Sequence, residues 1–232
     1  MTTSSPALLA CSGLRKRFGD KLVFDNLNLA LPAGVVALTG ENGSGKSTLL
    51  SLLCGIHAPD AGSIGIAGHD LATQPRLAKQ QLSFVPDEPV AYDFMTGFEY
   101  MMLMYTLKRI KPAAGDQQLL ELFNIDLSRH LQFKNMSLGT QRKFTLAAGL
   151  LGKPAVLLMD EPTNGLDAAA KQLLAERIRA CRTDTLVLFS THDQAFIDAT
   201  GATVLPLSGM QGAGAARPAS GLNQAHGAHV AV

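Results

Sequence analysis

The strongest constraint in this sequence is a glycine-rich turn that separates an apolar run, Val35 to Thr39, from a helix-forming segment that continues to Cys54. Glycines let backbone N–H groups turn inward around an anion, and the N-terminus of a helix adds the positive end of its dipole. A buried strand, a phosphate-binding loop and a helix are therefore predicted in this order. The loop consists of Gly40, Glu41, Asn42, Gly43, Ser44, Gly45, Lys46, Ser47 and Thr48.

A second apolar run, Val156 to Met159, ends in the two carboxylates Asp160 and Glu161. An acidic group beside a phosphate-binding loop predicts that Lys46 contacts the β- and γ-phosphates of ATP, while Ser47 and Asp160 hold Mg²⁺. Glu161 is then placed to polarise the attacking water as a general base. A capping Asp and a solvated Glu would be the better explanation of an isolated pair. The loop upstream favours the catalytic interpretation.

Hydrophobic periodicity indicates three kinds of structure along the chain. Alternation of apolar and polar residues around 27–31 indicates antiparallel strands near the N-terminus. Unbroken apolar runs at 83–85, 156–159 and 186–189 are typical of parallel strands that are covered on both faces. Between about 92 and 145 the apolar residues recur at helical spacing, which predicts an inserted helical subdomain.

The expected fold is α/β: a P-loop NTPase with a parallel-sheet core, an N-terminal antiparallel β subdomain and an inserted α-helical subdomain. Residues 1–207 are assigned to this one domain. Residues 208–232 contain mostly Gly, Ala, Ser and Asn, with almost no large apolar side chain. Burial cannot repay the entropy of ordering such a segment, so a disordered tail is predicted there.

Composition narrows the choice of partners and location. The 232 residues carry a formal net charge of +1, so electrostatics gives no reason to expect nucleic acid or anionic lipid as a ligand. No apolar run approaches the roughly 20 residues that cross a bilayer. The first ten residues lack the basic start of a secretory signal. Three scattered cysteines suit reduced thiols. A cytoplasmic chain is expected.

The remaining motifs resemble the nucleotide-binding domain of ABC ATPases, over about Leu8 to Leu207. The segment Asp160 to Asp167 is similar to the family's Walker B strand running into its D-loop. Ser137 to Arg142, at the start of an apolar helix, is similar to the ABC signature, which separates this family from other P-loop proteins. His192 directly follows the run 186–190 and resembles the switch histidine of the family.

The resemblance implies that these residues act at sites shared by two subunits. In the family, two domains dimerise head to tail, so Ser137 and Gly139 are expected to contact the γ-phosphate bound by the partner's loop, with Gln141 in the same nucleotide-binding set. Asp167 would face the opposite subunit, and His192 would hydrogen-bond the γ-phosphate and the attacking water. Taken alone, Ser137 is explained by an ordinary N-cap and His192 by a surface loop. The order and spacing of the motifs favour the functional roles.

Three positions need separate comment. Phe18 falls where the family often places an aromatic ring that stacks on adenine, although a core position would explain it equally well. Asp87 stands where the family usually has Gln; it could still approach Mg²⁺ or water, with an altered rate or coupling. Leu138 stands where the commonest signature has Gly. Similar variants occur in transporter subunits that resemble the bacitracin-efflux and ABC-2 exporter groups.

The leading interpretation is an ATPase that drives transport through a separate transmembrane permease subunit. It would work as a homodimer or as a heterodimer with a second ATP-binding subunit, on the cytoplasmic face of the cell membrane. The lack of the C-terminal regulatory domain that many importer ATPases carry favours export. Two alternatives stay open: a soluble ABC ATPase acting in translation, on DNA or in cell division, and a nucleotide-gated assembly subunit with little turnover, motivated by Asp87.

Overall fold

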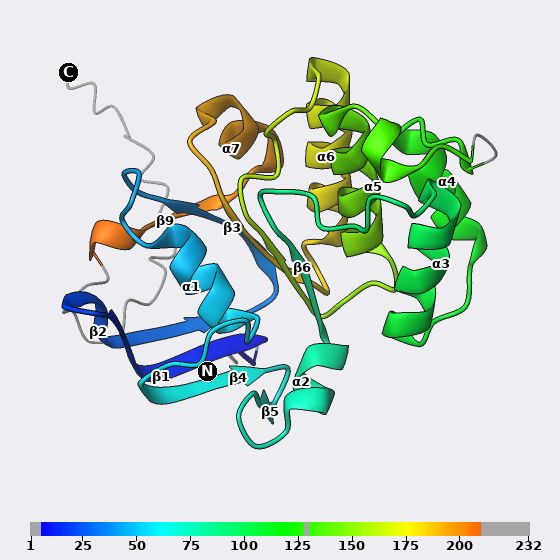
Figure 1. Ribbon diagram of the computed structural model, residues 1–232. Coiled ribbons are helices and arrows are strands. Elements are labelled where there is room, and N and C mark those ends of the chain that lie inside the picture. Colours follow the sequence, from blue (N-terminus) through cyan, green and yellow to red (C-terminus); the bar gives the residue numbers. More distant parts are fainter. Residues whose placement is uncertain (1–5, 128–129, 210–232) are drawn as a thin grey trace, which may run out of the picture.

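The computed structural model describes residues 6–127 and 130–209, which form two sheets with helices packed against them (Figure 1). The larger sheet is parallel, with the strand order β6-β7-β8-β3-β9. Its strands are β3 (Gly34–Thr39), β6 (Leu82–Val85), β7 (Val156–Met159), β8 (Leu186–Ser190) and β9 (Thr203–Pro206).

The smaller sheet is antiparallel, with the order β2-β1-β4-β5. Its strands are β1 (Leu9–Phe18), β2 (Lys21–Leu31), β4 (Ala61–Ile66) and β5 (His69–Asp70). Alternate side chains of the long β1–β2 hairpin are buried, among them Leu27 and Leu29. One face of this sheet therefore contributes to a core, and the other faces solvent.

Seven α-helices and two short 3₁₀ turns lie in the described part of the chain. They are α1 (Lys46–Leu53), α2 (Pro75–Gln80), α3 (Gly97–Lys108), α4 (Ala114–Leu122), α5 (Leu138–Leu150), α6 (Ala168–Cys181), α7 (Gln194–Thr200), η2 (Phe133–Asn135) and η3 (Leu207–Gly209). Within residues 6–127 and 130–209, no helix is both long enough and apolar enough to span a bilayer.

The parallel sheet separates two hydrophobic cores, because successive side chains of a strand point to opposite faces. In β8, Leu186 and Leu188 pack into the core that holds α1 and the antiparallel sheet. Val187 and Phe189 pack into the core on the other face, with α5, α6 and α7. All four are fully buried, which explains why the sequence of this strand is apolar without interruption.

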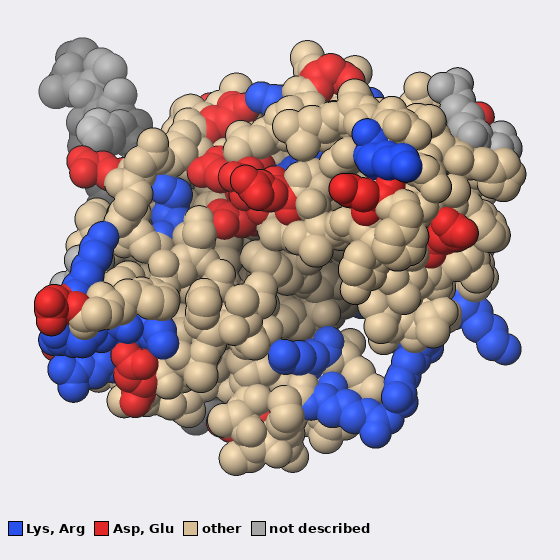
Figure 2. Space-filling view, in the orientation of Figure 1, with Lys and Arg blue, Asp and Glu red and all other residues tan. Residues whose placement is uncertain are grey.

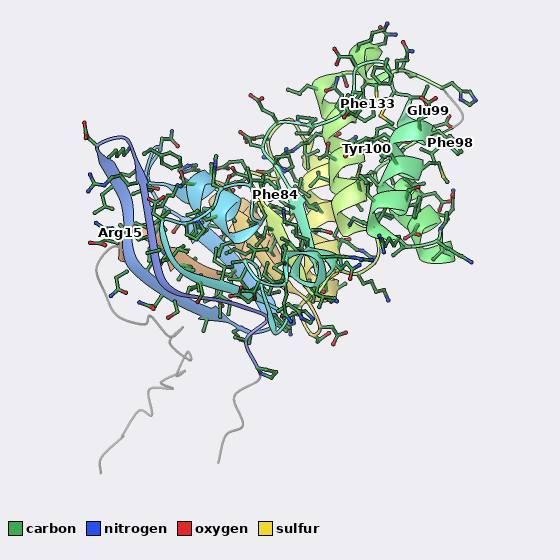
Figure 3. The ribbon with its side chains drawn as sticks, turned by 60° about the horizontal axis from the view of Figure 1, so that its bottom comes forward. Arg15, Phe84, Phe98, Glu99, Tyr100 and Phe133 are labelled. Atoms are coloured by element: carbon green, nitrogen blue, oxygen red, sulfur yellow. The ribbon has the colours of Figure 1, made fainter. Side chains whose placement is uncertain are left out.

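Helices α3, α4 and α5 form a lobe beside the sheets (Figure 3), and an aromatic cluster within it joins α3, η2 and α5. The ring of Phe133 lies 4.9 Å from that of Tyr100 and 5.6 Å from that of Phe144, measured between centroids. Gly97 begins α3 against this cluster, and a Cβ atom there would lie 2.2 Å from Phe144 Cζ. Only glycine permits this approach, so the start of α3 is fixed closely against α5.

The predicted fold class is confirmed: a P-loop α/β architecture with a parallel sheet, an antiparallel sheet near the N-terminus and a helical lobe. The four predicted parallel strands are present, and β9 is a fifth that was not predicted. The assignment of 1–207 to one domain remains a prediction. Of the predicted tail, Ser208 and Gly209 belong to η3, and the rest lies outside the described residues.

Candidate functional site

The carboxyl ends of the parallel strands bring the predicted site residues to one edge of the sheet. The glycine loop follows β3, Asp87 follows β6, Asp160 and Glu161 follow β7, and His192 follows β8. These strands are neighbours in the sheet. This edge is where open α/β sheets bind their ligands, so segments that are far apart in the sequence form one site.

The glycine loop leaves the start of α1 open. Gly45 precedes the helix with φ +106, and no side chain caps the first N–H groups. A Cβ atom on Gly45 would lie 2.9 Å from Val23 Cγ1 and 3.2 Å from Phe24 Cζ on β2. The position thus requires glycine both for its backbone angle and for space. The free N–H groups and the helix dipole provide donors for an anion.

Lys46 places a buried positive charge inside this loop. Its side chain is 7% exposed, and Nζ donates to the carbonyl oxygens of Gly40 (2.8 Å) and Glu41 (3.1 Å). Nζ also lies 3.0 Å from Nε2 of His192. The loop and the segment after β8 are therefore joined through Lys46.

The two carboxylates after β7 are held in different ways. Asp160 is 6% exposed, and its Oδ1 accepts a hydrogen bond of 2.5 Å from Ser190 Oγ. The same Ser190 hydroxyl oxygen accepts from the backbone N–H of Glu161 at 2.8 Å. Glu161 directs Oε1 to within 3.5 Å of His192 Nε2. Asp160 is thus fixed in the interior, while Glu161 lies beside the histidine and the lysine.

Glu161 has the electrostatic surroundings of a base. Burial raises the pKa of its carboxyl group, and His192 and Lys46 oppose this rise with their positive potential. The carboxylates of Asp160 and Asp87 raise the pKa further. A carboxylate whose pKa is moved toward neutrality is a better proton acceptor near pH 7 than one in water. Glu161 therefore has both the placement and the basicity for activating a water molecule.

The donor set fits a magnesium ion held together with a phosphate. Ser47 lies in the first turn of α1, where its hydroxyl is exposed, and Asp160 supplies a buried carboxylate. Hydroxyl and carboxylate oxygens suit Mg²⁺, which usually keeps several waters and phosphate oxygens as further ligands. In the described part of the chain, no group of three or more His, Cys, Asp or Glu side chains could hold a metal by itself.

Asp87 has protein partners in this structure. Its Oδ1 accepts from Asn164 Nδ2 at 2.9 Å and lies 4.0 Å from Nη2 of Arg142. Its side chain is 48% exposed. The carboxylate therefore connects the turn after β6 with the turn that follows Glu161, and its effect on the pKa of Glu161 places it within electrostatic reach of the site. Its predicted contact with Mg²⁺ or water remains a prediction.

The segment that resembles the signature forms the exposed start of α5. Ser137 is its N-cap, and Oγ accepts from the backbone N–H of Thr140 at 3.2 Å. Gly139 lies close to the turn at Gly165, whose carbonyl oxygen would be 3.0 Å from a Cβ atom on Gly139. Gln141 points inward, because its Nε2 donates to Phe133 O at 2.7 Å. Ser137 and Gly139 are thus at the surface, whereas Gln141 supports its own lobe.

Phe18 and Asp167 are two further predicted contacts, and both are accessible. Phe18 ends β1 and is 44% exposed, with its ring edge-on to His57 at 5.6 Å and Lys16 Nζ 5.1 Å from its centroid. This exposure leaves ring surface available for stacking. Asp167 caps α6 by accepting from Ala170 N at 2.8 Å and pairs with Lys143 at 3.2 Å.

Three residues that the sequence analysis did not select take part in the site. Ser190 bridges Asp160 and the backbone of Glu161, Asn164 binds Asp87, and Arg142 donates to backbone carbonyls on both sides. An arginine just before the mostly apolar stretch Phe144 to Leu150 was a visible signal for Arg142. Ser190 had a weaker one, as a polar residue that ends an apolar strand.

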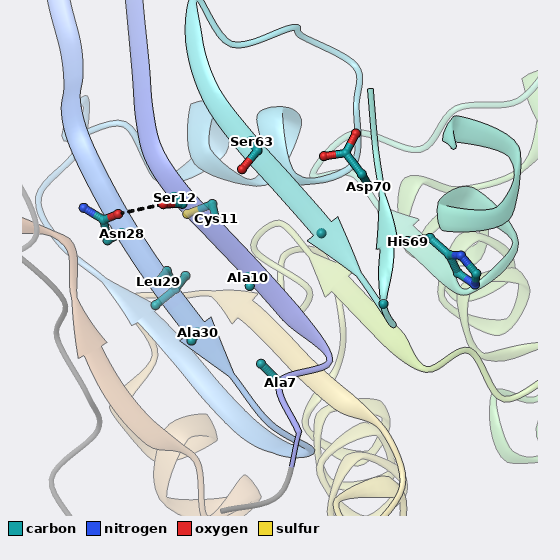
Figure 4. Close-up of a pocket in the computed structure, with 12 residues that line it drawn as sticks. Ala7, Ala10, Cys11, Ser12, Asn28, Leu29, Ala30, Ser63, His69 and Asp70 are labelled. Carbon is teal, nitrogen blue, oxygen red and sulfur yellow. Dashed lines mark hydrogen bonds between the residues drawn. The ribbon is translucent and has the colours of Figure 1, made fainter. Parts of the chain in front are cut away.

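A large hollow lies elsewhere, on the open face of the antiparallel sheet (Figure 4). Its volume is about 500 Å³, and small side chains such as Ala10, Ala30 and Ser63 line it. Asn28 Oδ1 accepts from Ser12 Oγ there at 3.4 Å. The loop, the two carboxylates and His192 do not contribute to this hollow. Size alone therefore does not locate the reactive site.

Charged side chains gather in separate areas of the surface (Figure 2). Lys and Arg lie over the tip of the β1–β2 hairpin and around α2, whereas Asp and Glu gather over the loops beside α6 and α7.

A glycine loop around a buried lysine, with an aspartate and a glutamate at the end of a strand in the same parallel sheet, defines the class of P-loop nucleotide-binding proteins.

Comparison with known proteins identifies the family. The family model described as ABC transporter matches residues 24–164, more than half of the chain. The chain belongs to the ABC transporter family, and the part present is its ATP-binding domain.

Individual relatives point to the same family. The chain is 34% identical over 199 residues to the Nod factor export ATP-binding protein I of a Rhizobium species, covering 81% of this chain and 64% of the relative. The protein of the same name from Burkholderia lata is 35% identical over 185 residues, covering 77% and 60%. The chain thus spans less than two thirds of these relatives. A solved ATP-binding subunit of an ABC transporter superposes with a TM-score of 0.76 at 27% identity, covering 89% of this chain and 95% of that one.

Proposed function

We propose that this chain is the ATP-hydrolysing subunit of an ABC exporter. The contact between Lys46, His192 and Glu161 carries the proposal: Nε2 of His192 lies 3.0 Å from the lysine and 3.5 Å from the glutamate. A cation for the phosphates, a hydrogen-bonding imidazole and a carboxylate with a raised pKa meet at the glycine loop. These are the groups that hydrolysis of a phosphoanhydride requires.

In the proposed reaction, the carboxylate of Glu161 accepts the proton of a water molecule as its oxygen attacks the γ-phosphorus, and the bond to the β-phosphate oxygen breaks. Lys46 and the N–H groups at the start of α1 stabilise the negative charge on the phosphates. His192 orients the water or the γ-phosphate through Nε2. Mg²⁺, held by Ser47 and Asp160, would supply further positive charge at the phosphates.

We also propose that the active form contains two such subunits. The exposure of Ser137 and the partial exposure of Gly139 at the start of α5 support their contact with a γ-phosphate bound by a second subunit. The carboxylate of Asp167 caps α6 and pairs with Lys143 but is exposed to an approaching partner, and the ring of Phe18 is accessible for adenine. Gln141 is given a supporting role, because its amide is used within its own lobe.

A groove between β6 and α3 supports docking of a transmembrane permease subunit on the cytoplasmic face of the membrane. It has a volume of about 410 Å³ and apolar walls that include Phe84, Val90 and Met104. Phe84 and Tyr100 lie on the two elements that border it (Figure 3). The names of the two bacterial relatives, which specify export, favour export as the direction.

The test of hydrolysis is Glu161→Gln, which keeps the shape of the side chain and removes the base. We expect a rate of ATP hydrolysis at least about 100-fold lower, with ATP affinity within a few-fold of the original. Glu176→Gln, on the exposed face of α6, is the matched control and should hydrolyse ATP normally. Normal turnover in Glu161→Gln would exclude Glu161 as the base.

The test of transport uses the same variant as bait. ATP-loaded Glu161→Gln is expected to stay in the closed dimer and to retain its partner during purification from detergent-solubilised membranes of the native host. Recovery of a multi-span membrane protein, absent when Lys46→Ala is the bait, supports the transporter. Recovery of ribosomes or DNA-bound proteins without a membrane protein would favour the soluble ABC ATPase instead.

A further inference from the structure

Arg142 is the largest side chain among those that are almost completely buried in the described structure. It lies in the second turn of α5 and is 1% exposed. A guanidinium group in the interior is costly unless its donors are satisfied. The one carboxylate within ion-pair distance of it among the described residues is Asp87, at 4.0 Å. Most of its donors therefore need partners other than carboxylates.

Those partners are backbone carbonyl oxygens at the ends of two neighbouring strands. Nη2 donates to Asp160 O at 2.9 Å and to Glu161 O at 2.7 Å, directly after β7. Nη1 donates to Pro86 O and Asp87 O, directly after β6. The planar guanidinium thus joins α5 to both turns at once. A lysine could not do this, because its single nitrogen cannot reach four carbonyls in a fixed plane.

One of these turns holds the proposed base in an unusual backbone conformation. Glu161 has a φ of +42°, in the left-handed region that residues other than glycine and asparagine rarely adopt. The peptide between Asp160 and Glu161 is held on both sides: its carbonyl accepts from Arg142, and its N–H donates to Ser190 Oγ. The next carbonyl, of Glu161 itself, accepts from Arg142 as well. Strained conformations persist where the surroundings fix them in this way.

We propose that Arg142 is a positioning residue for ATP hydrolysis, which holds the backbone of Glu161 so that its carboxylate points to His192. Because Arg142 belongs to the helix that begins at Ser137, it also links that helix start to the turns that carry Glu161 and Asp87. A displacement of α5 would be passed to the base through these four hydrogen bonds. The proposal rests on the proposed function, since it assigns Arg142 a role in that reaction.

The experiment compares Arg142→Lys and Arg142→Met with Arg179→Gln, an exposed control on α6. We expect kcat to fall about 100-fold in Arg142→Met, as for a base that is misplaced by about 1 Å, and less in Arg142→Lys. The KM for ATP should stay within about threefold, because Arg142 does not touch the glycine loop. A purely structural role would lower the amount of folded protein and leave kcat per folded molecule unchanged, which would overturn the proposal.

A second measurement does not depend on turnover. Hydrogen exchange of the peptide that contains 160–161 should become faster in Arg142→Lys, while exchange of α1 (46–53) stays as in the original protein. Unchanged exchange at 160–161 would overturn the positioning role. If the original protein binds ATP but does not hydrolyse it, the proposed function fails, and this exchange measurement still decides whether Arg142 fixes Glu161.

Discussion

Two helices of this protein begin at predicted phosphate contacts, and they begin differently. At the start of α1 no side chain caps the helix, Gly45 has a left-handed conformation, and the lysine in the first turn is buried. At the start of α5, Ser137 Oγ already accepts from the N–H of Thr140, and Leu138 is 64% exposed. The start of α1 leaves its backbone N–H groups for a ligand, whereas the start of α5 satisfies one of its N–H groups with its own serine hydroxyl.

The difference shows how a single chain can contain one complete and one incomplete anion site. An uncapped helix start is costly unless an anion binds, and the surroundings of α1, between two sheets, fix it in that state. A capped helix start is stable without a ligand, and a phosphate bound by a partner subunit can take the place of the cap. In the proposed dimer, the first site would bind ATP, and the second would respond to it.

The largest effect is expected when the positive charge of the first site, at the start of α1, is removed. Lys46→Ala eliminates the buried ammonium and its bonds to Gly40 O, Glu41 O and His192, so we expect ATP affinity to fall at least about 100-fold. Titration with a fluorescent ATP analogue measures this. Lys171→Ala removes a partly buried cation that pairs with Asp193, outside the glycine loop, and should bind ATP as before. Equal affinities in the two variants would contradict the assignment of the first site.

A smaller change tests whether the uncapped start of α1 depends on glycine. Gly45→Ala introduces a Cβ atom 2.9 Å from Val23 and a side chain at φ +106, and should lower the free energy of unfolding by about 2–4 kcal/mol. Gly43→Ala is the matched control: its φ is +76, but no atom lies within 4 Å of the added carbon, so only about 1 kcal/mol is expected. Urea denaturation measures both, and equal losses would rule out the steric argument.

The pH dependence of hydrolysis sharpens the role of the base beside the first site. The pKa of Glu161 is raised, and the active form is the carboxylate, so activity is full above this raised pKa and falls as the pH drops through it. Below it, kcat should decrease about tenfold per pH unit. ATP binding measured over the same range separates this effect from loss of substrate. A rate that stays constant down to the usual pKa of a glutamate would contradict the prediction.

The smallest effect concerns the cap of the second site. Ser137→Ala should cost about 1 kcal/mol of stability, as expected for an N-cap. Thr96→Ala removes the corresponding cap of α3 and should cost a similar amount. The two variants should differ in hydrolysis, because only Ser137 is proposed to contact a phosphate. Equal rates after correction for stability would reduce Ser137 to a cap.

The sequence predicted the interior of the fold better than its margins. Strands β7 and β8 are buried on both faces, so their apolar runs were visible without any structure. Strand β9 is an edge strand with Val204 48% exposed, and its four residues include Thr203 and Pro206. Such a segment lacks the unbroken apolar pattern of a buried strand. It pairs with β3 only because the folded sheet offers that edge.

The site was predictable where its chemistry depends on neighbours in sequence. The glycine loop and the pair Asp160 and Glu161 are local patterns with known ligands. The bonds of Arg142 and Ser190 are not local, since their partners are separated from them by 18 to 56 positions. Backbone carbonyls carry no sequence signature, so no pattern could indicate that an arginine binds four of them. The same holds for the contact between Lys46 and His192.

The position of β3 in the sheet has a consequence for synthesis of the chain. This strand leads into the glycine loop near the beginning of the sequence, yet its neighbours are β8 and β9, with Gly34 opposite Leu186 and Val36 opposite Thr203. Leu207 then packs against Gly40 itself. A nascent chain on the ribosome therefore cannot complete its nucleotide pocket until almost the last of these residues has emerged. Until then, β3 remains an unpaired apolar segment, which makes this interval the one in which a chaperone would be of most use.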